Sequence, residues 1–224
     1  MNPRKHASAL LALLALQLIP VACKDKTPPP PPGAAVPTPP SPPLDAASPE
    51  SFRVKFVTTK GDFTVEVTRA WAPKGADRFY RLVTEGYFKD IRFFRVLPGF
   101  MAQFGLSGNA ALNAQMDSLR IPDDPVTQSN KRGMVTFATA GPNTRSNQFF
   151  IDYGDNASLD SQGFSPFGRV VDGMKVVDAM YGGYGEGAPN GLGPSQDSIA
   201  IKGNEYLQRA FPKLDYIKSA TLVK

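Results

Sequence analysis

The stretch IRFFRVLPGFMAQFG, residues 91–105, predicts two short strands, one over 91–97 and one over 100–105. Three later apolar runs also read as strands: GMVTFATA (133–140), QFFID (148–152) and PFGRVV (166–171). Ahead of them, two runs alternate apolar and polar residues around a turn at 59–61: FRVKFVT (52–58) and DFTVEVT (62–68). This alternation on both sides of a Gly-containing turn predicts a β-hairpin.

Two helices are expected among these strands. The first begins near Pro73 and places Phe79, Leu82 and Val83 on one face, and the second runs from about Met174 to Tyr181. Strands that do not alternate regularly with helices argue against a parallel doubly wound sheet. We therefore expect a single mainly β domain, closed into an antiparallel barrel without open edges, with residues 205–216 packed on its surface.

The distribution of histidine and cysteine excludes several kinds of site. The chain has 224 residues with one histidine, His6, and one cysteine, Cys23, so residues 24–224 contain neither imidazole nor thiol. A Ser-His-Asp or Cys-His nucleophile, a disulfide framework and a His- or Cys-ligated zinc site are therefore impossible there. The net charge of +5 is dispersed along the chain, and we expect no binding to nucleic acid.

The N-terminal segment predicts export. Residues 1–22 carry Arg4 and Lys5 ahead of an apolar stretch, 9–19, which is shorter than the roughly 20 residues needed to span a bilayer. We interpret 1–22 as a signal peptide. The small residue before a lone cysteine resembles a bacterial lipoprotein signal, in which Cys23 would be lipidated. The alternative is simple secretion with an unmodified Cys23.

Residues 23–50 are expected to form a proline-rich, disordered tether between the signal and the folded domain, 51–224. Half of the 22 prolines of the chain lie between Pro28 and Pro49. Such a tract favours an extended, solvated chain over a packed core. The alternative is a ligand for proline-binding modules, for which the sequence shows no partner. These segments together predict a protein of the cell envelope, lipid-anchored and facing the periplasm or the outside.

Two longer motifs, FFRVLPGFMAQ (93–103) and FATAGPNTRSNQFFI (137–151), resemble the signatures of the cyclophilins, the peptidyl-prolyl cis/trans isomerases. Similarity continues through LDSQGFSPFGRVVDGMKVVD (159–178). The resemblance implies a closed eight-stranded antiparallel barrel capped by two helices. It also implies isomerisation of Xaa-Pro bonds in unfolded or proline-containing polypeptides, with no cofactor and no metal. We expect a monomer that assists the folding of exported proteins.

The resemblance also assigns site residues. Arg95 would be the catalytic cation, and Gln103 would orient it. The implied substrate-binding residues are Phe100, Met101, Ala138, Thr139, Gln148, Phe150, Leu159 and Phe164. Without the resemblance, Arg95 in an alternating strand would be interpreted as a solvent-facing charge, and Phe93 and Phe149 remain core residues in either interpretation.

Three positions depart from the family pattern. Thr139 stands where relatives commonly have Asn, Phe164 falls near the place of the pocket His, and Ser158 replaces a Trp that many relatives carry. These departures motivate an alternative function, a non-catalytic module on the same fold that binds proline-containing peptides. Two other features are interpreted as loops: the adjacent Asp123 and Asp124, and GGYGEG (182–187), which follows a helix and does not open one.

Overall fold

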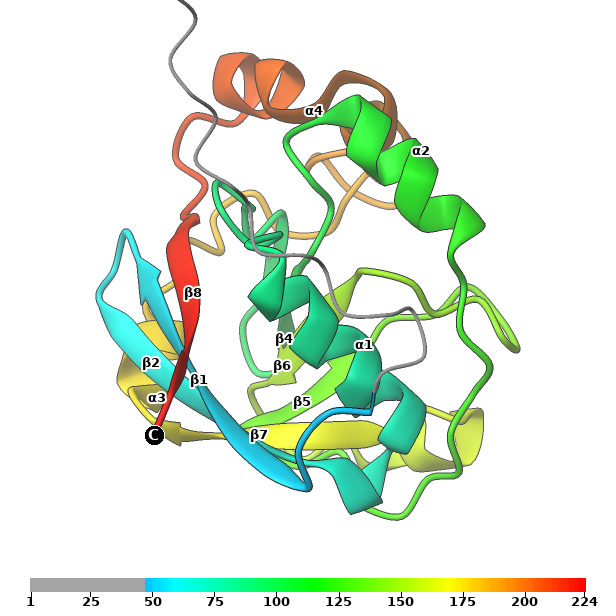
Figure 1. Cartoon of the computed structure of the whole chain (residues 1–224). Coiled ribbons are helices and arrows are strands. Elements are labelled where there is room, and N and C mark those ends of the chain that lie inside the picture. Colours follow the sequence, from blue (N-terminus) through cyan, green and yellow to red (C-terminus); the bar gives the residue numbers. More distant parts are fainter. Residues whose placement is uncertain (1–46) are drawn as a thin grey trace, which may run out of the picture. The chain divides into compact units, whose positions relative to one another are not determined.

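The structure is a computed structural model that describes residues 47–224 (Figure 1). Within this range the strands are β1 (Ser51–Thr58), β2 (Asp62–Thr68), β3 (Arg95–Leu97), β4 (Met101–Phe104), β5 (Met134–Phe137), β6 (Phe149–Asp152), β7 (Pro166–Asp172) and β8 (Ile217–Val223). The helices are α1 (Pro73–Thr84), α2 (Ala110–Ser118), α3 (Met174–Asp178) and α4 (Gln196–Ala210), with short 3-10 turns η1 (Arg69–Trp71) and η2 (Ala157–Gln162). The expected signal peptide, most of the tether and Cys23 lie outside the described residues.

The strands form one antiparallel sheet in the order β3-β4-β6-β5-β7-β2-β1-β8. The predicted hairpin is confirmed, since β1 pairs with β2 from Ser51↔Thr68 to Val57↔Asp62. The alternating burial of β1 and β2 shows why: every second side chain points into the core, as a sheet with one buried face requires.

The prediction of a closed barrel is wrong, because the sheet is open between its end strands β3 and β8. Only an isolated bridge between Arg92 and Tyr216, with its neighbouring backbone bonds, joins the segments that precede them. The physical reason is divergence: from Ile217 onward β8 runs along β1, whereas from Arg95 onward β3 pairs with β4. The two end strands are therefore not paired by hydrogen bonds, and only the short segments before them come together.

The prediction of two helices is incomplete. Helices α1 and α3 begin at the expected residues, but α2 and α4 were not expected, and they lie together at one end of the domain (Figure 1). Their sequences carry weak helical signals. Helix α4 is interrupted at Gly203, whose φ of +55° is left-handed, and a Cβ there would lie 2.0 Å from the carbonyl oxygen of Gly108. Only glycine, which has no Cβ, allows this close approach. The interruption also breaks the regular spacing of apolar residues along α4.

The core lies between α1 and the inner face of the sheet and is dominated by phenylalanine. Phe79 of α1 is fully buried, with its ring centroid 4.9 Å from that of Phe167 and 5.4 Å from that of Phe149. Phe93 and Phe149 are fully buried in this cluster, which confirms their interpretation as core residues. Such aromatic pairs add to the free energy of burial, so this face of the sheet is a rigid support.

A buried ion pair joins the loop before β5 to the loop before β6, and a backbone hydrogen bond ties it to the start of α1. The carboxylate of Asp124 accepts from Nη2 of Arg145 at 3.0 Å and from the backbone N–H of Gly75 at 2.9 Å. The side chains of Asp124 and Arg145 are only 2% and 3% exposed. Asp123 also faces Arg145, at 3.3 Å from its Nε. The interpretation of the two aspartates as loop residues is confirmed. Both carboxylates bind the buried Arg145, so their role is structural.

We predict that Asp124→Ala destabilises the fold by about 3–5 kcal/mol, because it leaves the Arg145 guanidinium buried without its main counter-charge. Urea denaturation of the variant and the wild type measures the difference. The matched control is Lys55→Ala, which removes an ion pair with Asp62 whose side chains are 45% and 46% exposed. That change should cost less than about 1 kcal/mol. Equal losses for both variants would contradict the assignment.

Candidate active site

Three side chains stand in a row across neighbouring strands on the outer face of the sheet. Arg95 of β3 is directly opposite Gln103 of β4, and Gln103 is directly opposite Phe150 of β6. Residues directly opposite in antiparallel strands project from the same face. Met101, two residues before Gln103, shares this face, whereas the intervening Ala102 belongs to the core on the other side.

The guanidinium of Arg95 is held by hydrogen bonds from two directions. Its Nη1 donates to Oε1 of Gln103 at 3.0 Å, and Nε2 of Gln103 donates to Oε1 of Gln148 at 3.0 Å. Its Nε and Nη2 donate to the two carboxylate oxygens of Glu186, at 2.6 and 2.7 Å. These bonds from Arg95 hold the pKa of the Glu186 carboxyl below its usual value, so the pair is ionic at neutral pH.

An apolar hollow lies beside this charge. Met101 and Phe150 are 2% and 4% exposed, and the ring of Phe164 meets that of Phe150 edge to face at 5.8 Å. Phe100 closes the side nearest Arg95, whose Cζ lies 5.9 Å from the ring centroid. A charged donor therefore stands next to an aromatic surface that excludes water.

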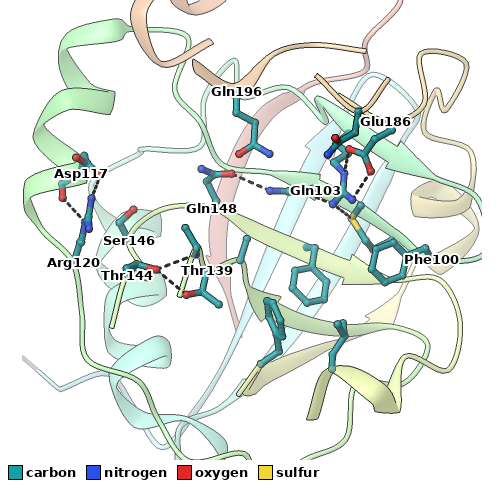
Figure 2. A pocket seen from close by; sticks show the side chains of 18 residues that line it. Phe100, Gln103, Asp117, Arg120, Thr139, Thr144, Ser146, Gln148, Glu186 and Gln196 are labelled. Carbon is teal, nitrogen blue, oxygen red and sulfur yellow. Dashed lines mark hydrogen bonds and ion pairs between the residues drawn. The ribbon is translucent and has the colours of Figure 1, made fainter. Parts of the chain in front are cut away.

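The opposite wall comes from the loop after β5. The hydroxyl of Thr139 is bonded within this loop, to Thr144 at 2.8 Å and to the backbone N–H of Gly141 at 3.2 Å. The hydrogen bonds of the Thr139 side chain therefore stay within this loop. Figure 2 shows Thr139 and Thr144 on this wall, with Asp117 and Arg120 of the α2 region beyond them.

Every catalytic and substrate-binding residue expected from the sequence lines the same hollow, whose volume is about 490 Å³. They are Arg95, Phe100, Met101, Gln103, Ala138, Thr139, Gln148, Phe150, Leu159 and Phe164. Sequence reasoning missed several other lining residues, among them Glu186, Asn190 and Gln196. The glycine-rich segment 182–187 is a loop, as interpreted, but nothing in its pattern indicated that its one acidic residue would reach Arg95.

Comparison with known proteins places this chain in a family. Residues 53–199 match the family model described as cyclophilin type peptidyl-prolyl cis-trans isomerase/CLD. Peptidyl-prolyl cis-trans isomerase-like 1 of Aspergillus niger is 35% identical over 130 residues, which cover 57% of this chain and 80% of that protein. Peptidyl-prolyl cis-trans isomerase-like 3 of Mus musculus is 33% identical with the same coverage. The chain belongs to the cyclophilin-type peptidyl-prolyl isomerases.

Solved structures support the fold of this cyclophilin. A crystal structure of a cyclophilin-type peptidyl-prolyl cis-trans isomerase from Cryptosporidium parvum matches with a TM-score of 0.54 and 20% identity, covering 78% of this chain and 98% of that one. Another, determined in the presence of the dipeptide Ala-Pro, matches with a TM-score of 0.54 and 21% identity, covering 77% and 99%. Among residues 47–224, no group of three acidic, His or Cys side chains could hold a metal ion.

A buried carboxyl supports the rim of the cyclophilin site. Asp152, at the end of β6, is fully buried, and its Oδ1 accepts from Nδ2 of Asn156, while Oδ2 has no partner within the described residues. The same Nδ2 donates to the carbonyl oxygen of Phe100 at 2.9 Å. Burial raises the pKa of Asp152 to about 7, because the ionised form loses its hydration.

We predict that Asp152 makes the wild type lose stability as the pH rises from about 4 to about 7. In this window the unfolded state has released the proton and the folded state still holds it, so unfolding is increasingly favoured. Each unit of pKa difference is worth about 1.4 kcal/mol. The difference in free energy of unfolding between the wild type and Asp152→Asn, measured at several pH values, should change across this range. A constant difference would contradict the prediction.

Proposed function

We propose that this cyclophilin isomerises Xaa-Pro bonds by non-covalent catalysis, with Arg95 as the catalytic residue. The observation that carries the proposal is the guanidinium of Arg95 fixed beside an apolar hollow that can hold a pyrrolidine ring. The barrier to rotation about a peptide bond, about 18–20 kcal/mol, comes from amide resonance, and no covalent bond has to break. The site therefore needs to favour only the twisted amide.

The chemistry follows from what changes during rotation. In the twisted amide the prolyl nitrogen regains its lone pair and can accept a hydrogen bond, which the planar amide nitrogen cannot do. A donor next to that nitrogen stabilises the transition state more than either ground state, and this difference raises turnover. Arginine suits the role because it remains charged at any accessible pH. Gln103 would hold the guanidinium in place.

The apolar side chains would bind the proline. Phe100, Met101, Phe150, Leu159 and Phe164 form the hydrophobic side of the hollow, and burial of a pyrrolidine ring against them is favourable. In this proposal Ala138 and Thr139 offer backbone groups to the substrate chain and Gln148 offers its side-chain amide. Phe164 then supplies aromatic surface at the place where relatives carry a histidine, so binding of the ring does not depend on imidazole.

The alternative is a module that binds proline-containing peptides without useful turnover. It is motivated by Phe164 and Ser158, which replace the pocket His and Trp of many relatives. The two functions differ in one respect: a binding module needs the hollow and has no need for a fixed cation beside it. The bidentate contact to Arg95, together with the bond to Gln103, therefore favours catalysis.

We predict that Arg95→Ala lowers kcat/KM for a short Xaa-Pro peptide by about 10²-fold, because one transition-state donor is lost. Exchange spectroscopy of the peptide's cis and trans signals measures the rate, and a peptide titration measures affinity, which should change little. Arg132→Ala is the control, since Arg132 is an exposed arginine paired with Asp178 away from the hollow. Equal rates for Arg95→Ala and the wild type would leave only the binding module.

We also propose that the isomerase acts outside the cytoplasm on unfolded or newly exported chains, as a monomer held to a membrane by lipid at Cys23. The support is the sequence of residues 1–50, with its basic start, short apolar stretch and proline-rich tract. Within residues 47–224, no helix is long and apolar enough to cross a bilayer.

We predict that the mature protein, expressed in a bacterial host, begins at an acylated Cys23. Mass spectrometry of the N-terminal peptide and incorporation of a labelled fatty acid measure this, with Cys23→Ser as the unlabelled control. A mature protein with a free Cys23 thiol would instead indicate simple secretion.

A further inference from the structure

Glu186 makes the strongest contact to Arg95 in the site. Its two carboxylate oxygens accept from Nε at 2.6 Å and from Nη2 at 2.7 Å, the paired geometry of a bidentate carboxylate–guanidinium bond. The side chains of Arg95 and Glu186 are 23% and 35% exposed, so the pair is partly shielded from water. Figure 2 shows Glu186 at the rim of the hollow, near Gln103 and Phe100.

The loop over residues 182–195 fixes the backbone of Glu186. Its carbonyl oxygen accepts from the N–H of Gly193 at 2.8 Å, and its Oε1 also accepts from the N–H of Gly187 at 2.9 Å. Gly191 passes so close that a Cβ there would lie 2.3 Å from the Glu186 carbonyl oxygen. These hydrogen bonds hold the Glu186 carboxylate next to Arg95 before any substrate binds.

A second apolar cluster supports this loop. Its buried members are Phe94, Leu106, Ile199, Leu207 and Leu214, and its half-buried members are Tyr184, Tyr206 and Phe211. Tyr184 of the loop meets Phe211 edge to face at 5.0 Å, and the N–H of Ser195 donates to the hydroxyl of Tyr206 at 3.2 Å. Helix α4 and the residues after it therefore hold the loop that carries Glu186.

We propose that Glu186 is a positioning residue for the isomerase reaction, which holds the guanidinium of Arg95 in its catalytic orientation. This inference rests on the proposed role of Arg95. A long, flexible side chain gains effectiveness when it is held before the substrate binds, because the entropy of ordering is lost in advance. Gln103 alone restrains one end of the guanidinium, and the bond to Glu186 fixes its plane.

The ion pair with Glu186 leaves N–H groups of the Arg95 guanidinium free to donate to a substrate. Glu186 and Gln103 accept from three of its five N–H groups, and a fourth faces only the weakly accepting sulfur of Met101, 3.9 Å from Nη1. Donors therefore remain for the prolyl nitrogen. A carboxylate that blocked the site would instead have to leave before turnover, and the hydrogen bonds of the 182–195 loop oppose such movement.

The first test compares Glu186→Ala and Glu186→Gln with the wild type, using the full chain and a short Xaa-Pro peptide. We expect both variants to lower kcat by about tenfold with little change in KM, because orientation matters in the transition state more than in the ground state. Arg95→Ala is measured in parallel. In the Arg95→Ala background, Glu186→Ala should have no further effect, since the two residues act as a unit.

A second variant moves Glu186 without altering its carboxylate. Gly191→Ala places a Cβ against the Glu186 carbonyl oxygen and should lower kcat in the same way. The control in the same loop is Leu192→Ala, whose side chain is 94% exposed, and the control for lost negative charge is Glu205→Gln, an exposed glutamate on α4. Both should retain the wild-type rate.

A readout that does not depend on activity is the NMR signal of the Arg95 Nε–H group. It should exchange slowly with water in the wild type and faster in Glu186→Gln. A rise in kcat on loss of Glu186 would overturn the proposal in favour of an inhibitory contact, and an unchanged kcat would overturn it outright. If Arg95→Ala itself has the wild-type rate, the proposed function fails and not merely the role of Glu186.

Discussion

The pairing of Arg95 with Gln103 across β3 and β4 is the constraint on which the site depends. This register places the cation and its amide partner on the outer face, while the alternate residues Val96 and Ala102 enter the core. A shift of one residue would turn Arg95 toward the phenylalanine cluster, because side chains alternate between the faces of a strand. Burial of Val96 and Ala102 in the core therefore determines that Arg95 and Gln103 point toward the hollow on the other face.

The features that could be predicted from the sequence lie mostly in short segments with a regular local spacing of apolar residues. The β1–β2 hairpin, the start of α1 and the aromatic core positions all follow from local alternation and spacing. The positions around the hollow could be predicted because two motifs, one around Arg95 and one around Gln148, each place several of them together. Resemblance to a family supplied their meaning, since alternation alone would assign Arg95 to solvent.

The remaining features depend on contacts that local pattern does not encode. Glu186 reaches Arg95 across 91 residues of chain, from a glycine-rich loop without periodicity. Helix α4 turns at Gly203 to pass Gly108, so its apolar spacing is broken where the fold requires it. Closure of the sheet was predicted wrongly for a similar reason, because it depends on how far the segments at Arg92 and Tyr216 run together.

Two separate apolar clusters stabilise this domain, one beneath the sheet and one beneath the 182–195 loop. The two clusters share no residue, so a substitution in the second cluster removes no side chain from the first. A change in the second cluster therefore acts first on the 182–195 loop and on the position of Glu186, and not on the side chains packed beneath the open sheet. The support of the catalytic-site loop and the packing of the sheet thus rest on different side chains.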